Sequence, residues 1–165
     1  MKQNTKKLTL LSMGTALAMI LSYIEFLLPP IWSAVPGIKL GLANIVIIFL
    51  LYRMGIKYAV MVSLVRVVLS SLLFGTALTF AYSIAGAALS LLLMSVCKKL
   101  GLFSTVGVSI VGGVSHNLGQ IIMAIIILGT REIGYYMAVL AVTGTISGIF
   151  IGIAGTLMLK YIKRI

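Results

Sequence analysis

The chain alternates between long apolar segments and short polar links. Six apolar segments cover residues 8–28, 40–52, 58–74, 77–96, 103–128 and 133–159. All but the second have about 17 residues or more, enough for an α-helix to cross the hydrocarbon core of a bilayer. The links contain Gly, Pro and charged residues, which typically end helices. The pattern therefore predicts an all-α membrane protein, with a bundle of six transmembrane helices forming one transmembrane domain over residues 1–165.

The second segment is unusually short. At 1.5 Å per residue, its roughly 13 residues cover about 20 Å of a core about 30 Å thick. The link before it, residues 29–39, is the longest in the chain, and part of it would then lie at membrane depth. Irregular backbone is tolerated there when protein shields it or when it lines a wet cavity. We therefore expect a cavity open to the outer side and capped by this link, unless the second helix extends upstream through Pro36.

Basic residues lie mostly on one side of this pattern. The chain is 61% apolar and has 13 Lys and Arg residues against two acidic residues. With six spans, only Lys39 and Arg131 lie outside, and Arg66 lies within a span. Cytoplasmic loops are enriched in Lys and Arg, so we expect both termini in the cytosol and a multi-pass protein of a bacterial cytoplasmic membrane. The basic residues on the cytosolic side are Lys2, Lys6, Lys7, Arg53, Lys57, Lys98, Lys99, Lys160, Lys163 and Arg164.

Arg66 lies near the middle of the third apolar segment. A charge at this depth costs about 2.5–3.5 kcal/mol on insertion scales, and such residues usually face the bundle interior. Ser63 and Ser70 share its face at helical spacing. A guanidinium binds carboxylate or phosphate with two parallel hydrogen bonds, so Arg66 is a candidate clamp for an anionic substrate. The alternative is a structural pair with Glu25, which could instead accept a hydrogen bond from substrate or titrate.

The fifth apolar segment carries a second group of polar residues. Ser109, Gly113, His116 and Gln120 recur at helical spacing and should line one face, with Asn117 beside them. They could form a wall against which a ligand is placed, or hydrogen-bond to neighbouring helices. The chain has one His, one Cys and no Asp, so we expect no transition-metal site and no cofactor.

Small residues at four-residue steps allow helices to approach closely. The sixth segment has Gly144, Gly148 and Gly152, which we interpret as internal packing. The first segment has two such pairs, which could instead form a docking surface for a partner membrane protein. The docking candidates are Ser12, Gly14, Ala16 and Ala18.

Several catalytic motifs are missing from the sequence. Without Asp, the chain cannot supply the paired carboxylates that hold Mg²⁺-diphosphate in prenyl diphosphate synthases. It also lacks a Gly-x-x-x-x-Gly-Lys-Ser/Thr phosphate loop and a Gly-x-Ser-x-Gly nucleophile turn. We therefore expect no enzyme activity from the chain alone. Its hydrophobicity excludes a pure nucleic-acid binder.

Several short motifs, in this order, are similar to those of a known family. They are Pro-Gly-Ile-Lys-Leu-Gly-Leu-Ala-Asn at 36–44, Arg66, Leu-Phe-Gly at 73–75, Tyr-Ser-Ile-Ala-Gly at 82–86 and Ser-His-Asn-Leu-Gly-Gln at 115–120. Together they resemble the Gx transporter family, which is also labelled heptaprenyl diphosphate synthase component I. That family is similar to the S-components of energy-coupling factor (ECF) importers, which are small six-helix membrane bundles.

The resemblance implies a substrate-capture protein with a pocket on the outer side. Residues 29–39 would form its lid, and the small residues of the first helix would meet a transmembrane coupling subunit that works with ATPases. The substrate would be small and anionic or amphipathic. The residues expected to hold it are Trp32, Lys39, Asn44, Arg66, His116, Asn117 and Gln120, with Glu25 and Tyr82 nearby. The family's second label implies an alternative, a non-catalytic accessory subunit in polyprenyl diphosphate or quinone synthesis.

Overall fold

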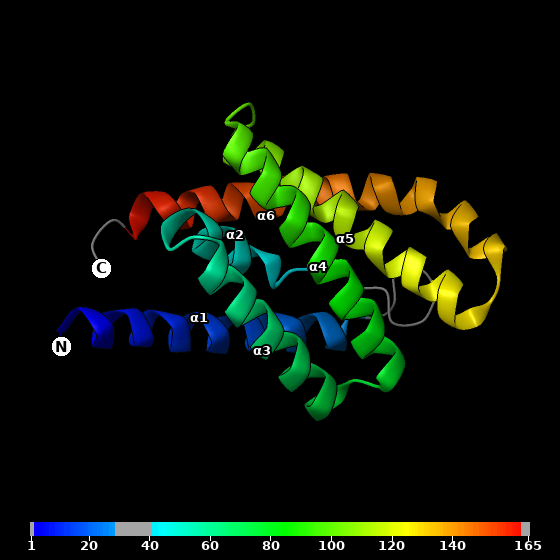
Figure 1. Ribbon diagram of the computed structural model, residues 1–165, viewed down its shortest axis with the longest axis horizontal. Helices are drawn as coiled ribbons and strands as arrows, with labels where there is room; N and C mark the ends of the chain where they lie inside the picture. The colour runs from blue at the N-terminus through cyan, green and yellow to red at the C-terminus, as the bar shows by residue number, and fades with distance from the viewer. Residues whose placement is uncertain (1, 29–40, 163–165) are drawn as a thin grey trace.

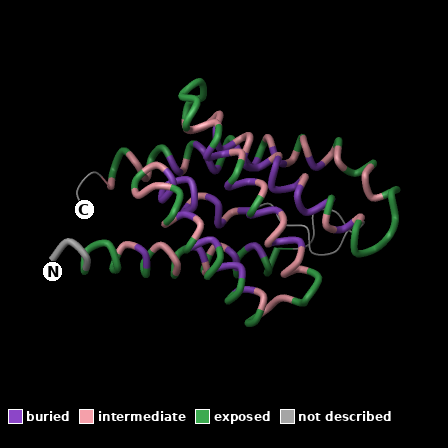
Figure 2. The backbone as a smooth tube through the Cα atoms, in the orientation of Figure 1, coloured by how far each residue is buried: buried purple, intermediate pink, exposed green. Residues whose placement is uncertain are grey.

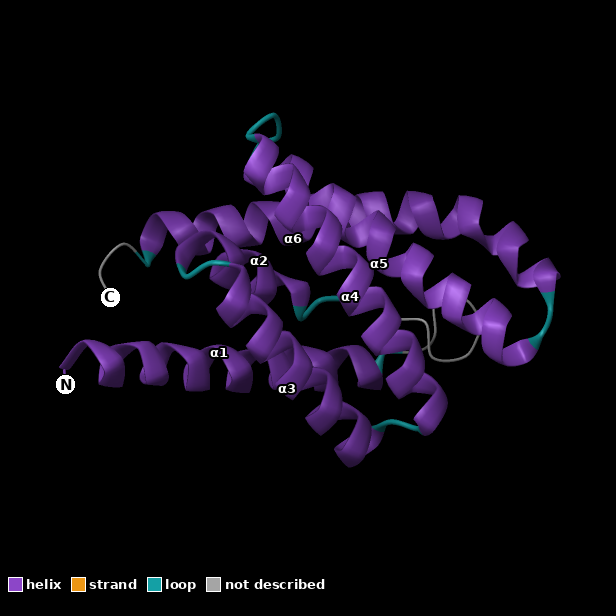
Figure 3. Cartoon of the chain, viewed as in Figure 1, coloured by secondary structure: helices purple, strands orange, loops and turns teal. Residues whose placement is uncertain are grey.

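The protein is a bundle of α-helices (Figures 1 and 3). A computed structural model describes residues 2–28 and 41–162, and side chains from residue 5 onward. Within these ranges there are six α-helices and one short 3₁₀-helix. They are α1 (Lys2–Leu27), α2 (Asn44–Arg53), α3 (Ile56–Phe74), α4 (Ala77–Leu100), α5 (Thr105–Leu128), η1 (Arg131–Tyr136) and α6 (Met137–Tyr161). The predicted all-α class and the six helices are confirmed.

Five helices are long and apolar enough to cross a membrane, and α2 is the exception. It has 10 residues, so it is shorter than the predicted segment 40–52. Residues 41–43 form a turn instead, in which the Asn44 N–H donates to the Gly41 carbonyl. The sixth segment also differs from the prediction, because its first residues form η1 and the α-helix begins at Met137. A helix of 10 residues is about 15 Å long, so α2 does not span an ordinary bilayer by itself.

Local sequence explains several helix ends. The Ser104 hydroxyl accepts the Gly107 N–H at the start of α5, as N-cap residues do. Thr76 and Thr79 form a reciprocal capping box at the start of α4. Gly101 and Gly129 end α4 and α5 with φ near +69° and +68°, a conformation that favours glycine.

The short helix α2 lies inside the bundle. It packs against α1, α3 and α6, whereas α5 lies between α4 and α6. Seven of its residues, including Ile47, Ile48 and Leu50, are buried, and Figure 2 shows buried backbone concentrated in the middle of the molecule. A helix that is apolar on all sides is expected in a core, so α2 is a central packing element.

Lys98 of α4 contacts the C-terminal end of α2. Its Nζ donates to the Leu51 carbonyl at 2.6 Å and lies 5.0 Å from the centre of the Tyr52 ring. Both contacts are favourable, because helix C-termini carry partial negative charge and aromatic faces attract cations.

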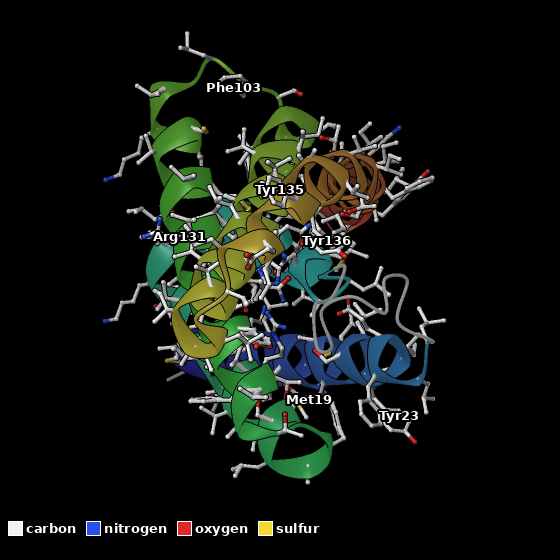
Figure 4. The ribbon with its side chains drawn as sticks, turned by 90° about the vertical axis from the view of Figure 1, so that its right-hand side faces the viewer. Met19, Tyr23, Phe103, Arg131, Tyr135 and Tyr136 are labelled. Atoms are coloured by element: carbon white, nitrogen blue, oxygen red, sulfur yellow. The ribbon has the colours of Figure 1, made fainter. Side chains whose placement is uncertain are left out.

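The two ends of the bundle differ in what they carry. α1 begins and α6 ends at the same end, where the turn between α2 and α3 also lies (Figure 1). Seen from the other end, Tyr135 and Tyr136 of η1 lie on one side and Tyr23 of α1 on the other (Figure 4). All three tyrosines are exposed, and tyrosine is enriched where membrane meets water. The arrangement agrees with termini on one shared side, and which side is cytosolic stays a prediction.

Candidate functional site

Polar side chains from four helices are buried in the interior of this apolar protein. We call this group the polar centre. Its members are between 0% and 8% exposed: Ser22 and Glu25 of α1, Asn44 of α2, Arg66 of α3, and His116 and Gln120 of α5. Polar and charged groups are costly in a membrane protein's interior and mark functional sites more often than chance. The sequence predicted all of these residues for the site except Ser22.

Glu25 connects α1 to both α2 and α3. Its Oε1 accepts the backbone N–H of Gly41 at 2.5 Å, and its carboxylate acts electrostatically on the Arg66 guanidinium. Ser22 is buried one turn earlier on α1. Glu25 and Arg66 are thus close enough to act on one another electrostatically, and a structural pair between them stays one of the predicted alternatives.

Two glycines make room for the side chains of the polar centre. Gly41 has φ +82°, and a Cβ there would lie 2.8 Å from Asn44 Nδ2 and 3.7 Å from His116 Cδ2. A Cβ on Gly86 would lie 3.0 Å from His116 Cε1. The imidazole therefore lies between the turn before α2 and the middle of α4. Both glycines belong to the sequence motifs, but the motifs alone did not reveal this steric role.

Several polar atoms of the centre have no hydrogen-bond partner among the described residues. They are Nε and Nη2 of Arg66, Nδ2 of Asn44, both amide atoms of Gln120 and Oγ of Ser22. Leaving a buried donor or acceptor unsatisfied costs about 1–3 kcal/mol. Native proteins rarely retain several such groups in one place, and a bound polar molecule would satisfy them.

Asn117 has a different role from its neighbour His116. Its Nδ2 donates to the Leu140 carbonyl of α6 at 2.8 Å, and a Cβ on Gly144 would lie 2.9 Å from the same atom. Asn117 therefore faces α6 and joins two helices. Of the two alternatives for the polar residues of this segment, helix–helix bonding describes Asn117.

Tyr82 is buried in a small cluster beside the polar centre. It is 1% exposed and packs with Ala124, Met123 and Ile133. Tyr82 and Gly86 are one turn apart on α4, and Gln120 and Ala124 are one turn apart on α5. This spacing places the ring about one helical turn from Gln120, closer to η1.

The predicted docking stripe on α1 divides between two faces. Ser12 and Ala16 are exposed, whereas Ala18 is fully buried. A Cβ on Gly14 would touch Val46 and Leu50 of α2. Gly14 therefore lies against α2 and Ala18 is buried, so only Ser12 and Ala16 of this stripe are exposed. Two other predicted site residues, Trp32 and Lys39, and the predicted lid at 29–39 lie outside the described residues.

No group of three or more His, Cys, Asp or Glu side chains that could hold a metal ion occurs in the described part of the chain. The chemistry available in the polar centre is hydrogen bonding and charge from one guanidinium, one carboxylate, one imidazole and two amides. These groups can bind a small polar molecule and hold it in one orientation.

Fold and site together define an all-α, multi-pass membrane protein with a polar interior. The family model described as heptaprenyl diphosphate synthase component I matches residues 15–158. The chain belongs to the heptaprenyl diphosphate synthase component I family, as the motif resemblance predicted. No curated protein and no solved structure matches the chain.

Proposed function

We propose that this protein binds a small anionic or amphipathic molecule in its polar centre and serves its transport across the bacterial cytoplasmic membrane. The observation that carries the proposal is the set of buried polar atoms without partners on Asn44, Arg66 and Gln120. These residues come from three different helices, so a single molecule between them would satisfy groups that the protein leaves unsatisfied.

The positions of these residues support access from the outer side. Glu25 lies two residues before the end of α1, and Asn44 is the first residue of α2. α1 runs from the end of the bundle that carries the chain termini toward the opposite end, so its last turn lies nearer that opposite end (Figure 1). With cytosolic termini, as the distribution of basic residues predicts, this end faces outward. The molecule would then be captured from outside and held above the buried helix α2.

Energy for transport would come from partners. By its resemblance to S-components of ECF importers, the protein would work with a transmembrane coupling subunit and ATPases. The exposed small residues Ser12 and Ala16 are the part of α1 that remains available for such a contact. The protein would itself have no enzyme activity in this role.

The binding proposal is tested with the purified protein in lipid nanodiscs. Native mass spectrometry should detect a small molecule retained by the wild type and lost from Arg66→Lys, with Arg131→Lys as the exposed arginine control. The transport proposal is tested by measuring uptake of that molecule in cells with and without the coupling ATPases. Unchanged uptake without the ATPases would contradict the ECF version.

A second candidate function is favoured by the name of the matched family. As component I of a heptaprenyl diphosphate synthase, the chain would be a membrane subunit that anchors a soluble synthase through its cytosolic basic residues or presents lipid to it. This version predicts co-purification with a synthase subunit and faster chain elongation. It also predicts that neutralising Lys57, Lys99 and Lys160 does more harm than Arg66→Lys, the reverse of the binding proposal.

A further inference from the structure

One complete edge of the Arg66 guanidinium has no acceptor. Its Nε and Nη2 lack hydrogen-bond partners among the described residues, and the side chain is only 4% exposed. The N–H bonds of these two nitrogens run parallel, and the two oxygens of a carboxylate or phosphate fit such a fork. An oxyanion on this edge would satisfy both N–H groups with charge-assisted hydrogen bonds.

The charge of the polar centre decides between the possible oxyanions. The Arg66 guanidinium lies within electrostatic reach of the Glu25 carboxylate, and in their ionised forms the two charges cancel. A bound monoanion leaves one uncompensated negative charge, whereas a phosphate monoester or a diphosphate leaves about two or three. Buried charge without compensation is costly.

The other unsatisfied atoms of the polar centre indicate which further groups the bound substrate carries. Asn44 Nδ2 is a donor, Gln120 offers a donor and an acceptor, and the Ser22 hydroxyl can act as either. These groups are uncharged, so they favour hydroxyl or carbonyl groups on the substrate over a second charge.

We infer that the polar centre binds a small monocarboxylate with at least one further neutral oxygen group, and that its carboxylate lies on the Nε–Nη2 edge of Arg66. The inference rests on the proposed binding function and narrows it. A prenyl diphosphate, which the name of the family suggests, is a poor match for a centre that contains one guanidinium beside a carboxylate.

The test compares matched probes that differ only in the anionic group. One series is para-hydroxybenzoate, para-hydroxybenzamide and para-hydroxyphenyl phosphate, and the other is omega-hydroxyhexanoate, its amide and the phosphate monoester of pentanediol. Each probe is added to the full chain in nanodiscs, and binding is measured by native mass spectrometry and thermal shift. The variants are Arg66→Lys, which keeps the charge but loses the fork, Gln120→Met, and the control Arg131→Lys.

We expect the carboxylates to bind the wild type and the Arg131→Lys control, and the amides and phosphates to bind at least tenfold more weakly. Arg66→Lys should weaken carboxylate binding by about tenfold or more, the effect of losing one charge-assisted hydrogen bond. Gln120→Met, which keeps both charges, should weaken it less and provides the test if Arg66→Lys does not fold.

Phosphates that bind as well as the carboxylates, with the same dependence on Arg66 or Gln120, would overturn the monocarboxylate inference but leave the binding function intact. Carboxylate binding that neither variant weakens would also overturn it. If no probe binds and the purified wild type retains no small molecule, the binding function itself fails.

Discussion

The polar side chains on the two sides of helix α5 differ in their hydrogen bonding. Toward α6, Asn117 Nδ2 donates to a backbone carbonyl at 2.8 Å, whereas its Oδ1 has no partner among the described residues. Glycines bring the backbones of α5 and α6 together. Toward α4, where its Cγ lies against Gly86, Gln120 has an amide with no partner for either atom among the described residues. These two residues are less than one turn apart. The comparison teaches that one amide of α5 joins a neighbouring helix through its N–H, whereas the other leaves both its donor and its acceptor available to a bound molecule.

The backbones of α5 and α6 approach closely because glycines lie at their interface. A Cβ on Gly148 would lie 2.6 Å from Ile110 Cα, and one on Gly152 would lie 2.7 Å from Val106 Cα. The obstacles are backbone and Cα atoms, which cannot move aside as a flexible side chain can. The predicted internal packing of the Gly144, Gly148 and Gly152 series is confirmed by these contacts.

The largest expected effect is therefore at this interface. Gly148→Val should destabilise the fold by about 3 kcal/mol or more, because a well-packed contact is overfilled and the backbone must shift. Thermal unfolding in nanodiscs measures it. Gly134→Ala is the matched control, since a Cβ there would meet only the Ile125 side chain at 3.8 Å. Equal stability of the two variants would contradict the close approach of α5 and α6.

The next largest effect concerns the two charged residues of the polar centre. Arg66→Met should destabilise the protein by about 3 kcal/mol, because Glu25 then lies buried without its positive neighbour. Adding Glu25→Gln should recover most of that loss, since both charges are gone. A double-mutant cycle measures the coupling. Additive effects of the two substitutions would show that these charges do not stabilise one another.

A smaller effect separates the two sides of α5 directly. Asn117→Leu should cost up to about 1 kcal/mol, because it removes the hydrogen bond to α6 together with one unpaired oxygen, and it should leave probe binding unchanged. Gln120→Leu should cost nothing or stabilise the free protein, because it removes buried unsatisfied groups, but should weaken binding. The same unfolding and mass-spectrometry measurements apply. A reversed pattern would remove the distinction on which the site is based.

The smallest effect repeats this comparison with two serines. Ser90 Oγ donates to the Gly112 carbonyl of α5 at 2.9 Å, whereas Ser22 Oγ has no partner among the described residues. Ser90→Ala should cost about 0.6 kcal/mol, as interhelical hydrogen bonds in membrane proteins do. Ser22→Ala should change the stability of the free protein by less. Chemical denaturation in mixed micelles can resolve the difference.

Much of this fold could be predicted because long apolar runs leave a chain few alternatives. The start of α2 could not, because the turn before it includes a contact between residues 16 positions apart, in which the Gly41 N–H donates to Glu25. The apolar character of segment 40–52 continues through residues 40–43 and gives no sign of that turn. The apolar pattern of the sequence predicted that α2 exists, but it did not predict the residue at which α2 begins.

The site was predictable in part for a similar reason. Depth and helical spacing selected Arg66, His116 and Gln120, all of which the structure buries. The spacing did not separate Asn117 from His116, because adjacent residues are only about 100° apart on a helix and the neighbouring helix decides their roles. On α1, residues two apart differ by about 200°, so Gly14 and Ala18 could not share an outer face with Ser12 and Ala16.

The contacts of Lys98 affect how strongly this protein is attracted to anionic lipid headgroups. Its ammonium is already engaged by the Leu51 carbonyl and the Tyr52 ring, so it is a poor partner for phosphatidylserine or phosphatidylglycerol. Attraction to an anionic leaflet grows by about 1 kcal/mol for each accessible basic residue. The protein should therefore bind an anionic membrane surface more weakly than the number of its lysines and arginines implies.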